Sequence, residues 1–273
     1  MFKISKLLYK FYESFLWPQI KDGPRPHHIG LIVDGNRRFA REKGKDVSYG
    51  HQLGIEKIED FLNWCWRLDI KVITLFAFST ENFNRAEHEV NDLMQLFHDK
   101  LRRYRNDPII ERERIRIKVI GQRKKLSDAL NYEISETEKM TAHHDRFQLN
   151  IAIGYGGRAE IVDAVKSLAH DVKKGSLRPD DITEEILAQN LYTTGIPDPD
   201  LIIRTSGEER LSGFLLWQSA YSELYFSEVY WPAFRMIDLW RAIRIYRSGS
   251  GVLENDCRQI PEERQHGPDE KRE

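Results

Sequence analysis

Short apolar runs alternate along this chain with longer amphipathic stretches, and this alternation constrains the fold more than any other feature. Apolar runs of strand length occur at 29–33, 72–78 and 147–153, with helical periodicity between them. A helix between two strands returns the chain to the same end of a sheet, so successive strands run parallel. The pattern predicts an α/β fold with a mostly parallel central sheet.

Further segments show the same apolar and amphipathic patterns. The sequence has no internal repeat and no interdomain linker, which indicates one main domain. Strands are also expected at 115–120, 201–203, 214–217 and 224–226. Helices are expected at 37–43, 52–67, 87–104, 126–141, 159–173 and 236–246.

The two ends of the chain differ from its middle. Residues 1–23 are expected to form an amphipathic helix, in which lysines flank an apolar stripe. Such a helix suits a membrane surface, and it equally suits packing against its own domain or a dimer mate. Residues 252–273 are polar and are expected to be disordered. The stripe consists of Ile4, Leu7, Leu8, Phe11, Phe15 and Leu16.

Composition excludes several classes of protein. The 42 basic and 43 acidic residues give a net charge of −1, so no overall field attracts nucleic acid. No stretch reaches the ~20 apolar residues that span a bilayer. Cys65 and Cys257 lack metal or redox spacing, which predicts a cytoplasmic protein, with peripheral contact at the inner membrane face through residues 1–17. His143 and His144 lie in a polar stretch and are expected to be solvated, since no second ligand pair has metal spacing.

The first motif joins a buried-type strand to an arginine-rich helix through the turn Asp34-Gly35-Asn36. Free N–H groups and the positive end of the helix dipole favour an anion above this turn, and Arg37, Arg38 and Arg41 add positive charge. Asp34 would repel a bound phosphate unless a divalent cation lay between them. The motif therefore indicates Mg²⁺ with a diphosphate, and an ordinary surface turn is the alternative.

Two more clusters follow expected strands. Segment 78–85 holds hydroxyls, amides, a carboxylate and an arginine, and segment 204–213 holds two arginines six residues apart with hydroxyls and glycines between them. Strand ends in parallel sheets form binding sites, and arginine forks suit a second diphosphate. A capping loop and a flexible surface loop are the respective alternatives.

These motifs together resemble the cis-prenyltransferase family, the undecaprenyl and dehydrodolichyl diphosphate synthases, over residues 24–251. The resemblance implies a six-stranded, mostly parallel sheet flanked by helices, with a hydrophobic tunnel in this catalytic domain. The matching segments are His28 to Arg38 with His51, Phe78 to Arg85 with Glu89, Tyr155 to Arg158, Arg204 to Glu208, Arg210 to Ser212, Phe214 to Gln218 and Glu223 to Phe226.

The resemblance also implies an activity. Such enzymes are Mg²⁺-dependent prenyltransferases that condense isopentenyl diphosphate onto an allylic prenyl diphosphate, and each addition lengthens a cis-polyprenyl lipid by one Z unit. The alternatives are transfer of the prenyl group to a non-standard acceptor and a role as one subunit of a heteromeric enzyme. Phe147 matches a tunnel-floor position, where its bulky ring favours a shorter product.

The family pattern implies roles for individual residues. Asp34 and Glu223 would serve the metal, and Asn82 with Ser79 would position the homoallylic unit or relay its proton. The catalytic set is Asp34, Asn36, Ser79 and Asn82. Allylic diphosphate would contact Gly35, Asn36, Arg37, Arg38, His51 and Arg85, and isopentenyl diphosphate would contact Arg204, Arg210 and Ser212. Further substrate contacts are expected from Phe39, Thr80, Glu81, Phe83, Leu211, Arg247 and Gly249.

The chain departs from the family pattern at position 47, where Val replaces an arginine that binds allylic diphosphate. Either Arg41 or Lys45 compensates, or the acceptor differs. Arg247 and Gly249 resemble the family's terminal RxG element, which reaches into the partner subunit's site. A homodimer is therefore the simplest expected assembly, with a paralogue as the alternative partner.

Overall fold

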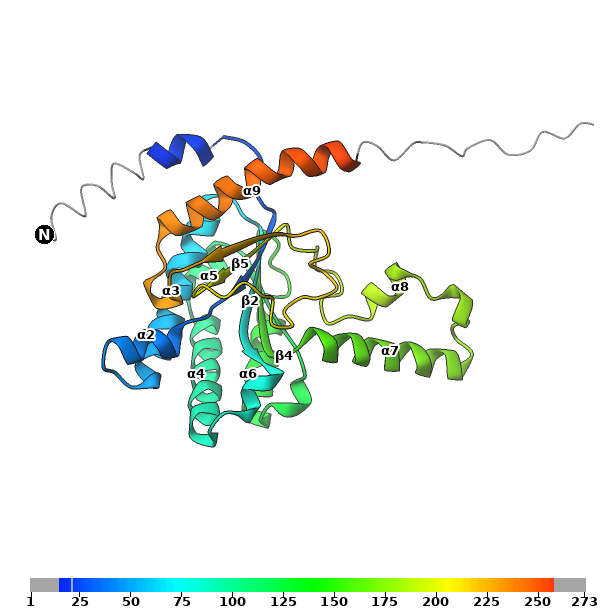
Figure 1. Ribbon diagram of the computed structural model, residues 1–273. Coiled ribbons are helices and arrows are strands. Elements are labelled where there is room, and N and C mark those ends of the chain that lie inside the picture. The colour runs from blue at the N-terminus through cyan, green and yellow to red at the C-terminus, as the bar shows by residue number, and fades with distance from the viewer. Residues whose placement is uncertain (1–14, 21, 258–273) are drawn as a thin grey trace, which may run out of the picture.

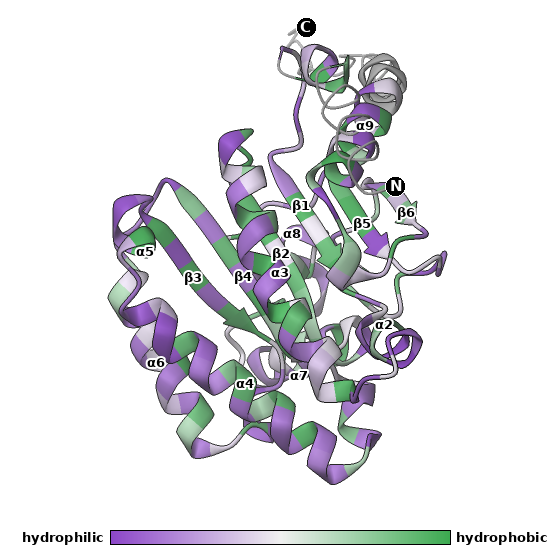
Figure 2. Ribbon diagram, turned by 90° about the vertical axis from the view of Figure 1, so that its left-hand side faces the viewer, coloured by the Kyte–Doolittle hydropathy of each residue, from purple (hydrophilic) through white to green (hydrophobic). Residues whose placement is uncertain are grey.

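The computed structural model describes residues 15–20 and 22–257, with side chains described as far as Ser248. Its centre is one sheet of six strands in the order β3-β4-β2-β1-β5-β6, and all neighbouring strands are parallel (Figure 2). This confirms the expected α/β fold and its six-stranded sheet. The strands are β1 (His28–Ile32), β2 (Val72–Ser79), β3 (Ile115–Ile120), β4 (Phe147–Tyr155), β5 (Leu201–Thr205) and β6 (Glu223–Ser227).

Helices cover both faces of the sheet. The α-helices are α2 (Asn36–Glu42), α3 (Val47–Arg67), α4 (Glu87–Arg105), α5 (Pro108–Arg112), α6 (Asp128–Thr141), α7 (Gly157–Lys174), α8 (Glu184–Gln189) and α9 (Met236–Cys257). The 3₁₀ helices are η1 (Thr80–Asn84), η2 (Arg123–Lys125), η3 (Pro179–Asp181) and η4 (Trp231–Ala233). In Figure 1, α3, α4 and α6 lie on one side of the sheet, whereas α7 and α8 extend away on the other.

Side chains alternate between two apolar clusters because successive residues of a strand point to opposite faces. Ile29 and Leu31 of β1 belong to the larger cluster, which includes side chains of α3 and α4. Ile32 belongs to a smaller cluster on the other face, which includes Phe214 and Leu215. Since both faces are covered at the centre of the sheet, β1 and β2 are almost entirely buried, whereas the edge strands β3 and β6 are buried only in part.

The expected strand at 214–217 is wrong. Phe214 and Leu215 are both fully buried in the same cluster, and Leu215 has a positive φ of 43°. Neighbouring residues of a strand point to opposite faces, so this turn packs two adjacent side chains in a way that a strand does not.

The last helix is longer than expected. α9 continues to Cys257 and so includes residues 252–257 of the expected tail, whereas residues 258–273 lie outside the part of the chain that is described. Glycine inside a helix costs only about 1 kcal/mol, so Gly249 and Gly251 weaken the helix without ending it.

The described part of the amino-terminal segment packs on its own domain. Residues 15–20 are helical, Leu16 and Ile20 are fully buried in the main core, and the ring of Trp17 lies 5.5 Å from that of Trp240. The rest of the expected helix, including the lysines of the membrane hypothesis, lies outside the described residues. Among residues 15–20 and 22–257, no helix has the length and apolarity to cross a membrane.

Buried His28 ties β1 to two neighbouring segments. Its Nδ1 donates a hydrogen bond to the carbonyl of Pro197 at 2.7 Å, and its Nε2 bonds with the hydroxyl of Thr74 at 2.8 Å. Burial lowers the pKa of His28 from 6.5 to about 4. The folded protein therefore binds a proton less readily than the unfolded chain, and stabilisation is complete above pH 6.5 and lost as the pH falls toward 4.

We expect protonation of His28 to lower the free energy of unfolding by about 1.4 kcal/mol for each unit that the pH falls between 6.5 and about 4. His28→Gln should remove that part of the pH dependence, whereas the exposed His170→Gln should retain it. Urea unfolding at a series of pH values measures the slope. Equal slopes in the wild-type and His28→Gln proteins would contradict the assignment.

Candidate active site

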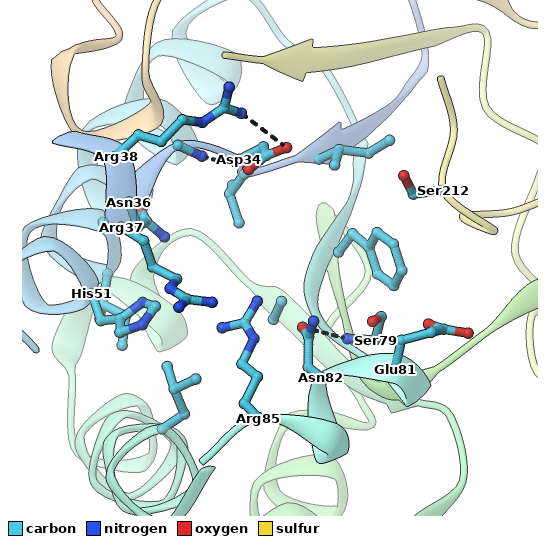
Figure 3. A pocket seen from close by; sticks show the side chains of 18 of the residues that line it. Asp34, Asn36, Arg37, Arg38, His51, Ser79, Glu81, Asn82, Arg85 and Ser212 are labelled. Carbon is cyan, nitrogen blue, oxygen red and sulfur yellow. Dashed lines mark hydrogen bonds and ion pairs between the residues drawn. The ribbon is translucent and has the colours of Figure 1, made fainter. Parts of the chain in front are cut away.

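A cavity of about 730 Å³ lies at the carboxyl ends of β1, β2 and β5 (Figure 3). Residues that follow these strands line its mouth, and residues of α3 and α4 complete its wall. The sequence-predicted residues that line it are Asp34, Gly35, Asn36, Arg37, Arg38, His51, Ser79, Glu81, Asn82, Arg85, Arg204 and Ser212. Arg41, which was expected to add positive charge here, also lines the cavity. Lining residues without a predicted role are Ile32, Val33, Gly54, Ile55, Phe76, Ala77, Leu93 and Phe97.

Asp34 lies between two guanidinium groups. Its Oδ2 accepts a hydrogen bond from Nη2 of Arg204 at 2.9 Å and lies 3.7 Å from Nη2 of Arg38. Its Oδ1 accepts from the backbone N–H of Gly35, which adopts a φ of 102° that a side chain would strain. The carboxylate is thus fixed in direction while one-third of its side chain stays exposed.

Arg204 is buried and depends on this carboxylate. Its Nη1 donates to the hydroxyl of Ser212 at 2.7 Å and to the carbonyl of Arg210. Its buried Nε has no hydrogen-bond partner among the described residues. A buried cationic donor with spare capacity, next to a cavity, suits an anionic oxygen.

A second group of cationic side chains meets on Glu89, a residue whose role the sequence did not predict. One oxygen, Oε1, lies 3.0 Å from Nη1 of Arg85, 3.3 Å from Nε2 of His51 and 3.8 Å from Nε of Arg37. Figure 3 shows Arg37 and Arg85 pointing into the same space below Asp34. The i, i+4 spacing of Arg85 and Glu89 was the available signal.

The electrostatics of this group leave a net positive charge. Burial favours a raised pKa for Glu89, but the hydrogen bond from His51 and the charges of Arg85 and Arg37 hold that pKa below its usual value. Burial lowers the pKa of His51 despite the contact with Glu89, so the ring is neutral at neutral pH. Two guanidiniums therefore face one carboxylate, which favours an anion in the cavity.

Close packing of α2 against α3 fixes Asn36. A Cβ at Gly50 would lie 2.2 Å from the backbone oxygen of Asn36, and one at Gly54 would lie 2.6 Å from its side-chain oxygen. These glycines are one helical turn apart on the same face of α3, so together they let the start of α2 approach this face closely.

Ser79 and Asn82 form a capping box at η1. The amide oxygen of Asn82 accepts from the backbone N–H of Ser79 at 3.0 Å, and the Ser79 side chain accepts in return. The capping alternative therefore accounts for these bonds, yet both residues also line the cavity. Thr80 donates to Glu81 at 3.0 Å and is not part of the lining.

Other predicted residues lie away from the cavity. Glu223 begins β6 opposite Leu201, whereas Asp34 follows the carboxyl end of β1. In a single chain the two carboxylates thus lie at opposite ends of the sheet, and the expected joint role of Asp34 and Glu223 at the metal stays a prediction. Arg210 is exposed and pairs with Glu208.

Arg247 contacts its own chain, donating to the carbonyl oxygens of Gln19 and of Asp22, the latter at 2.8 Å. It thereby links α9 to the amino-terminal segment, and Gly249 lies in the same helix. The predicted site residues that do not line the cavity are Phe39, Thr80, Phe83, Arg210, Leu211, Glu223, Arg247 and Gly249. Phe147 is likewise buried elsewhere, beside Trp66 at 5.8 Å, so the cavity lining does not trace the expected tunnel to it.

Two cationic groups, one fixed carboxylate and an apolar inner wall at the carboxyl edge of a parallel sheet define an α/β enzyme for phosphorylated, apolar substrates. Residues 32–250 match the family described as "Putative undecaprenyl diphosphate synthase". The chain belongs to this family and is a prenyltransferase.

Its relatives cover nearly the whole chain. The "Tritrans,polycis-undecaprenyl-diphosphate synthase (geranylgeranyl-diphosphate specific)" of Thermoplasma acidophilum is 49% identical over 245 residues, 90% of this chain and 95% of that protein. The "Isoprenyl transferase" of Thermus thermophilus is 48% identical over 249 residues, again 90% of this chain and 95% of that protein.

Solved structures show the same fold. Lavandulyl diphosphate synthase from Lavandula x intermedia, in complex with dimethylallyl diphosphate, superposes with a TM-score of 0.78 at 37% identity, covering 82% of this chain and 95% of that one. A probable undecaprenyl diphosphate synthase from Campylobacter jejuni has a TM-score of 0.67 at 32% identity, covering 82% and 96%.

We expect Glu89→Gln to lower kcat/KM for prenyl transfer by about tenfold or more, because hydrogen bonds to charged groups contribute about 1.5–3 kcal/mol. The variant keeps the side chain's size but loses the charge that orients Arg85 and Arg37. Steady-state kinetics measures the effect, with the exposed Glu87→Gln on the same helix as the matched control. Equal kcat/KM in the two variants would show that Glu89 does not organise the site.

Proposed function

We propose that this chain is a Z-polyprenyl diphosphate synthase, which adds isopentenyl diphosphate to an allylic prenyl diphosphate to build a cis-polyprenyl lipid. One observation carries the proposal: a single cavity is lined by Asp34, which lies between two arginines, and by Arg37 and Arg85, which both pair with Glu89. Two substrates that each carry a diphosphate need two such groups at a fixed separation.

The two groups divide the substrates between them. Arg37, Arg85 and the turn at Gly35 would hold the allylic diphosphate, whose C–O bond must ionise. Arg204 and Ser212 would hold isopentenyl diphosphate, and the spare Nε of Arg204 supports this role. Positive charge around the departing diphosphate lowers the barrier to ionisation, and fixed placement of the second substrate adds the orientation term.

The donor set at Asp34 fits Mg²⁺. One carboxylate at the cavity mouth is typical of Mg²⁺ sites that take their other ligands from substrate phosphates and water. When bound there, Mg²⁺ would neutralise diphosphate charge. Asp34 would supply the protein ligand, and Arg38 and Arg204 would keep its carboxylate directed at the diphosphate.

Ser79 and Asn82 would act on the second substrate. Both side chains line the cavity beside Arg85, where the capping box fixes them. The condensation releases a proton from the homoallylic unit, and a hydroxyl beside an amide can position that unit or pass the proton toward a diphosphate oxygen.

Apolar side chains would hold the growing chain. Ala77 of β2 and Leu93 and Phe97 of α4 form the apolar wall on one face of the sheet, and Phe76 lines the cavity from the other face. A tunnel that continues beyond this wall toward Phe147 is part of the proposal, and Phe147 would then limit product length.

The assembly proposed is a homodimer. β6 is an edge strand of the sheet, and Leu224 within it and the neighbouring Tyr221 are exposed apolar side chains. An edge strand with exposed apolar residues favours pairing with another surface. We also propose a cytoplasmic enzyme that contacts the membrane through residues 1–17, next to its lipid product.

The experiment that tests the function is incubation of the purified chain with labelled isopentenyl diphosphate, Mg²⁺ and allylic primers of increasing length, with products resolved by mass. A ladder in five-carbon steps is expected, and Asp34→Asn should reduce it by about a thousandfold. A single product that needs another acceptor, or activity only with an added paralogue, would support the alternatives instead. An unimpaired Asp34→Asn enzyme would contradict the metal assignment.

Primer choice is the second test. The relative from Thermoplasma acidophilum is named as geranylgeranyl-diphosphate specific, and we propose a long allylic primer for this chain also. Val47 lacks a charge, but Arg41 lines the cavity and would take over binding of the allylic diphosphate. Arg41→Ala should raise KM for the primer by about tenfold. Lys45→Ala is the matched control, and an equal effect on KM for isopentenyl diphosphate would contradict the assignment.

A further inference from the structure

A cluster of two histidines and a glutamate lies at the opposite end of the sheet from the catalytic cavity. Glu111 belongs to α5, and His143 and His144 follow α6 just before β4. One potential ligand atom from each side chain lies within 4.8 Å of the other two. Although the sequence predicted solvated histidines, His144 is only 3% exposed.

The contacts of His144 require a proton or a metal ion between its ring and Glu111. Its Nδ1 lies 2.9 Å from the carbonyl oxygen of Ile115, which can only accept, so Nδ1 carries the hydrogen. Nε2 of the neutral ring then presents a lone pair, and it lies 3.0 Å from Oε2 of Glu111, which also presents a lone pair. Two acceptors at this distance need a proton or a metal ion between them.

The surrounding charges leave Glu111 available. Each nearby arginine pairs with another carboxylate: Arg112 and Arg146 with Glu113, and Arg114 with Asp145. Within the described residues, Glu111 forms no ion pair with a lysine or an arginine, and three-quarters of its side chain is exposed. A cation from solvent therefore has open access to it.

We propose that Glu111, His143 and His144 form a binding site for Zn²⁺ or a similar borderline divalent cation. Imidazole nitrogens with one carboxylate oxygen are typical zinc ligands, and a backbone carbonyl that holds the other ring nitrogen is the usual support for such a histidine. Tetrahedral ligation at about 2.0–2.1 Å needs ligand atoms about 3.3 Å apart. Rotation of the exposed Glu111 and His143 side chains toward the fixed His144 provides this contraction.

The bound ion would be structural. It would join α5 to the connection between α6 and β4, beside the start of β3, and so brace the β3 edge of the sheet. Asp34 lies at the other end of the strands, so the zinc site is separate from the proposed Mg²⁺ site.

The test is calorimetric titration of the untagged full-length chain with Zn²⁺ in saturating Mg²⁺, paired with thermal unfolding. Wild-type protein should bind one Zn²⁺ ion that His143→Ala protein does not, with a rise in Tm of about 5 °C at saturation. His143→Ala removes an exposed ligand and so leaves the buried packing intact. Glu111→Gln should weaken the binding by at least about tenfold.

The exposed His170→Ala, on α7, is the matched control and should bind Zn²⁺ like the wild type. Equal zinc binding and equal Tm shifts in His143→Ala and His170→Ala would overturn the proposal, because the ion would then bind elsewhere. Wild-type protein without zinc binding would also overturn it, since the contact between His144 and Glu111 would then be a protonated ion pair.

Discussion

The ion pair between Asp34 and Arg204 connects the sheet to its chemistry. Arg204 is 4% exposed, and a charged group buried to that extent requires a partner of opposite charge. The pair forms only because β1 and β5 are adjacent and parallel, with Ile32 opposite Arg204. Strand order therefore brings together two residues that are 170 positions apart. The loop that carries Ser212 is held by the same guanidinium.

Most of the fold was predictable because the physical signal was local. A sheet covered on both faces gives apolar runs, and these located β1, β2, β4 and β5 within a few residues. The edge strand β3 was located instead by its alternation of apolar and charged residues. The segment 214–217 carried the same apolar signal for another reason, since Phe214 and Leu215 fill one face of the sheet from a turn. An apolar run reports burial, and it does not report the backbone conformation that produces the burial.

The site was predictable where its residues lie at the carboxyl end of a strand or just after it, as Ser79, Arg204 and Asp34 do. It was less predictable where the fold decides position. Glu223 stands at the start of its strand, so parallel pairing carries it to the end of the sheet away from Asp34. Glu89 had only its spacing from Arg85 as a local signal, because Arg37 and His51 approach it through the packing of α2 and α3 on α4.

One carboxylate oxygen of Glu89 serves three donors, and this sharing has a consequence for inheritance. Residues that contact a common partner are energetically coupled, so the effect of changing one depends on the identity of the others. The effect of a substitution at Arg37, His51 or Arg85 on the site therefore depends on the other two residues. Sequence drift at these four positions would proceed by correlated replacement, and the cluster would be gained or lost as a whole.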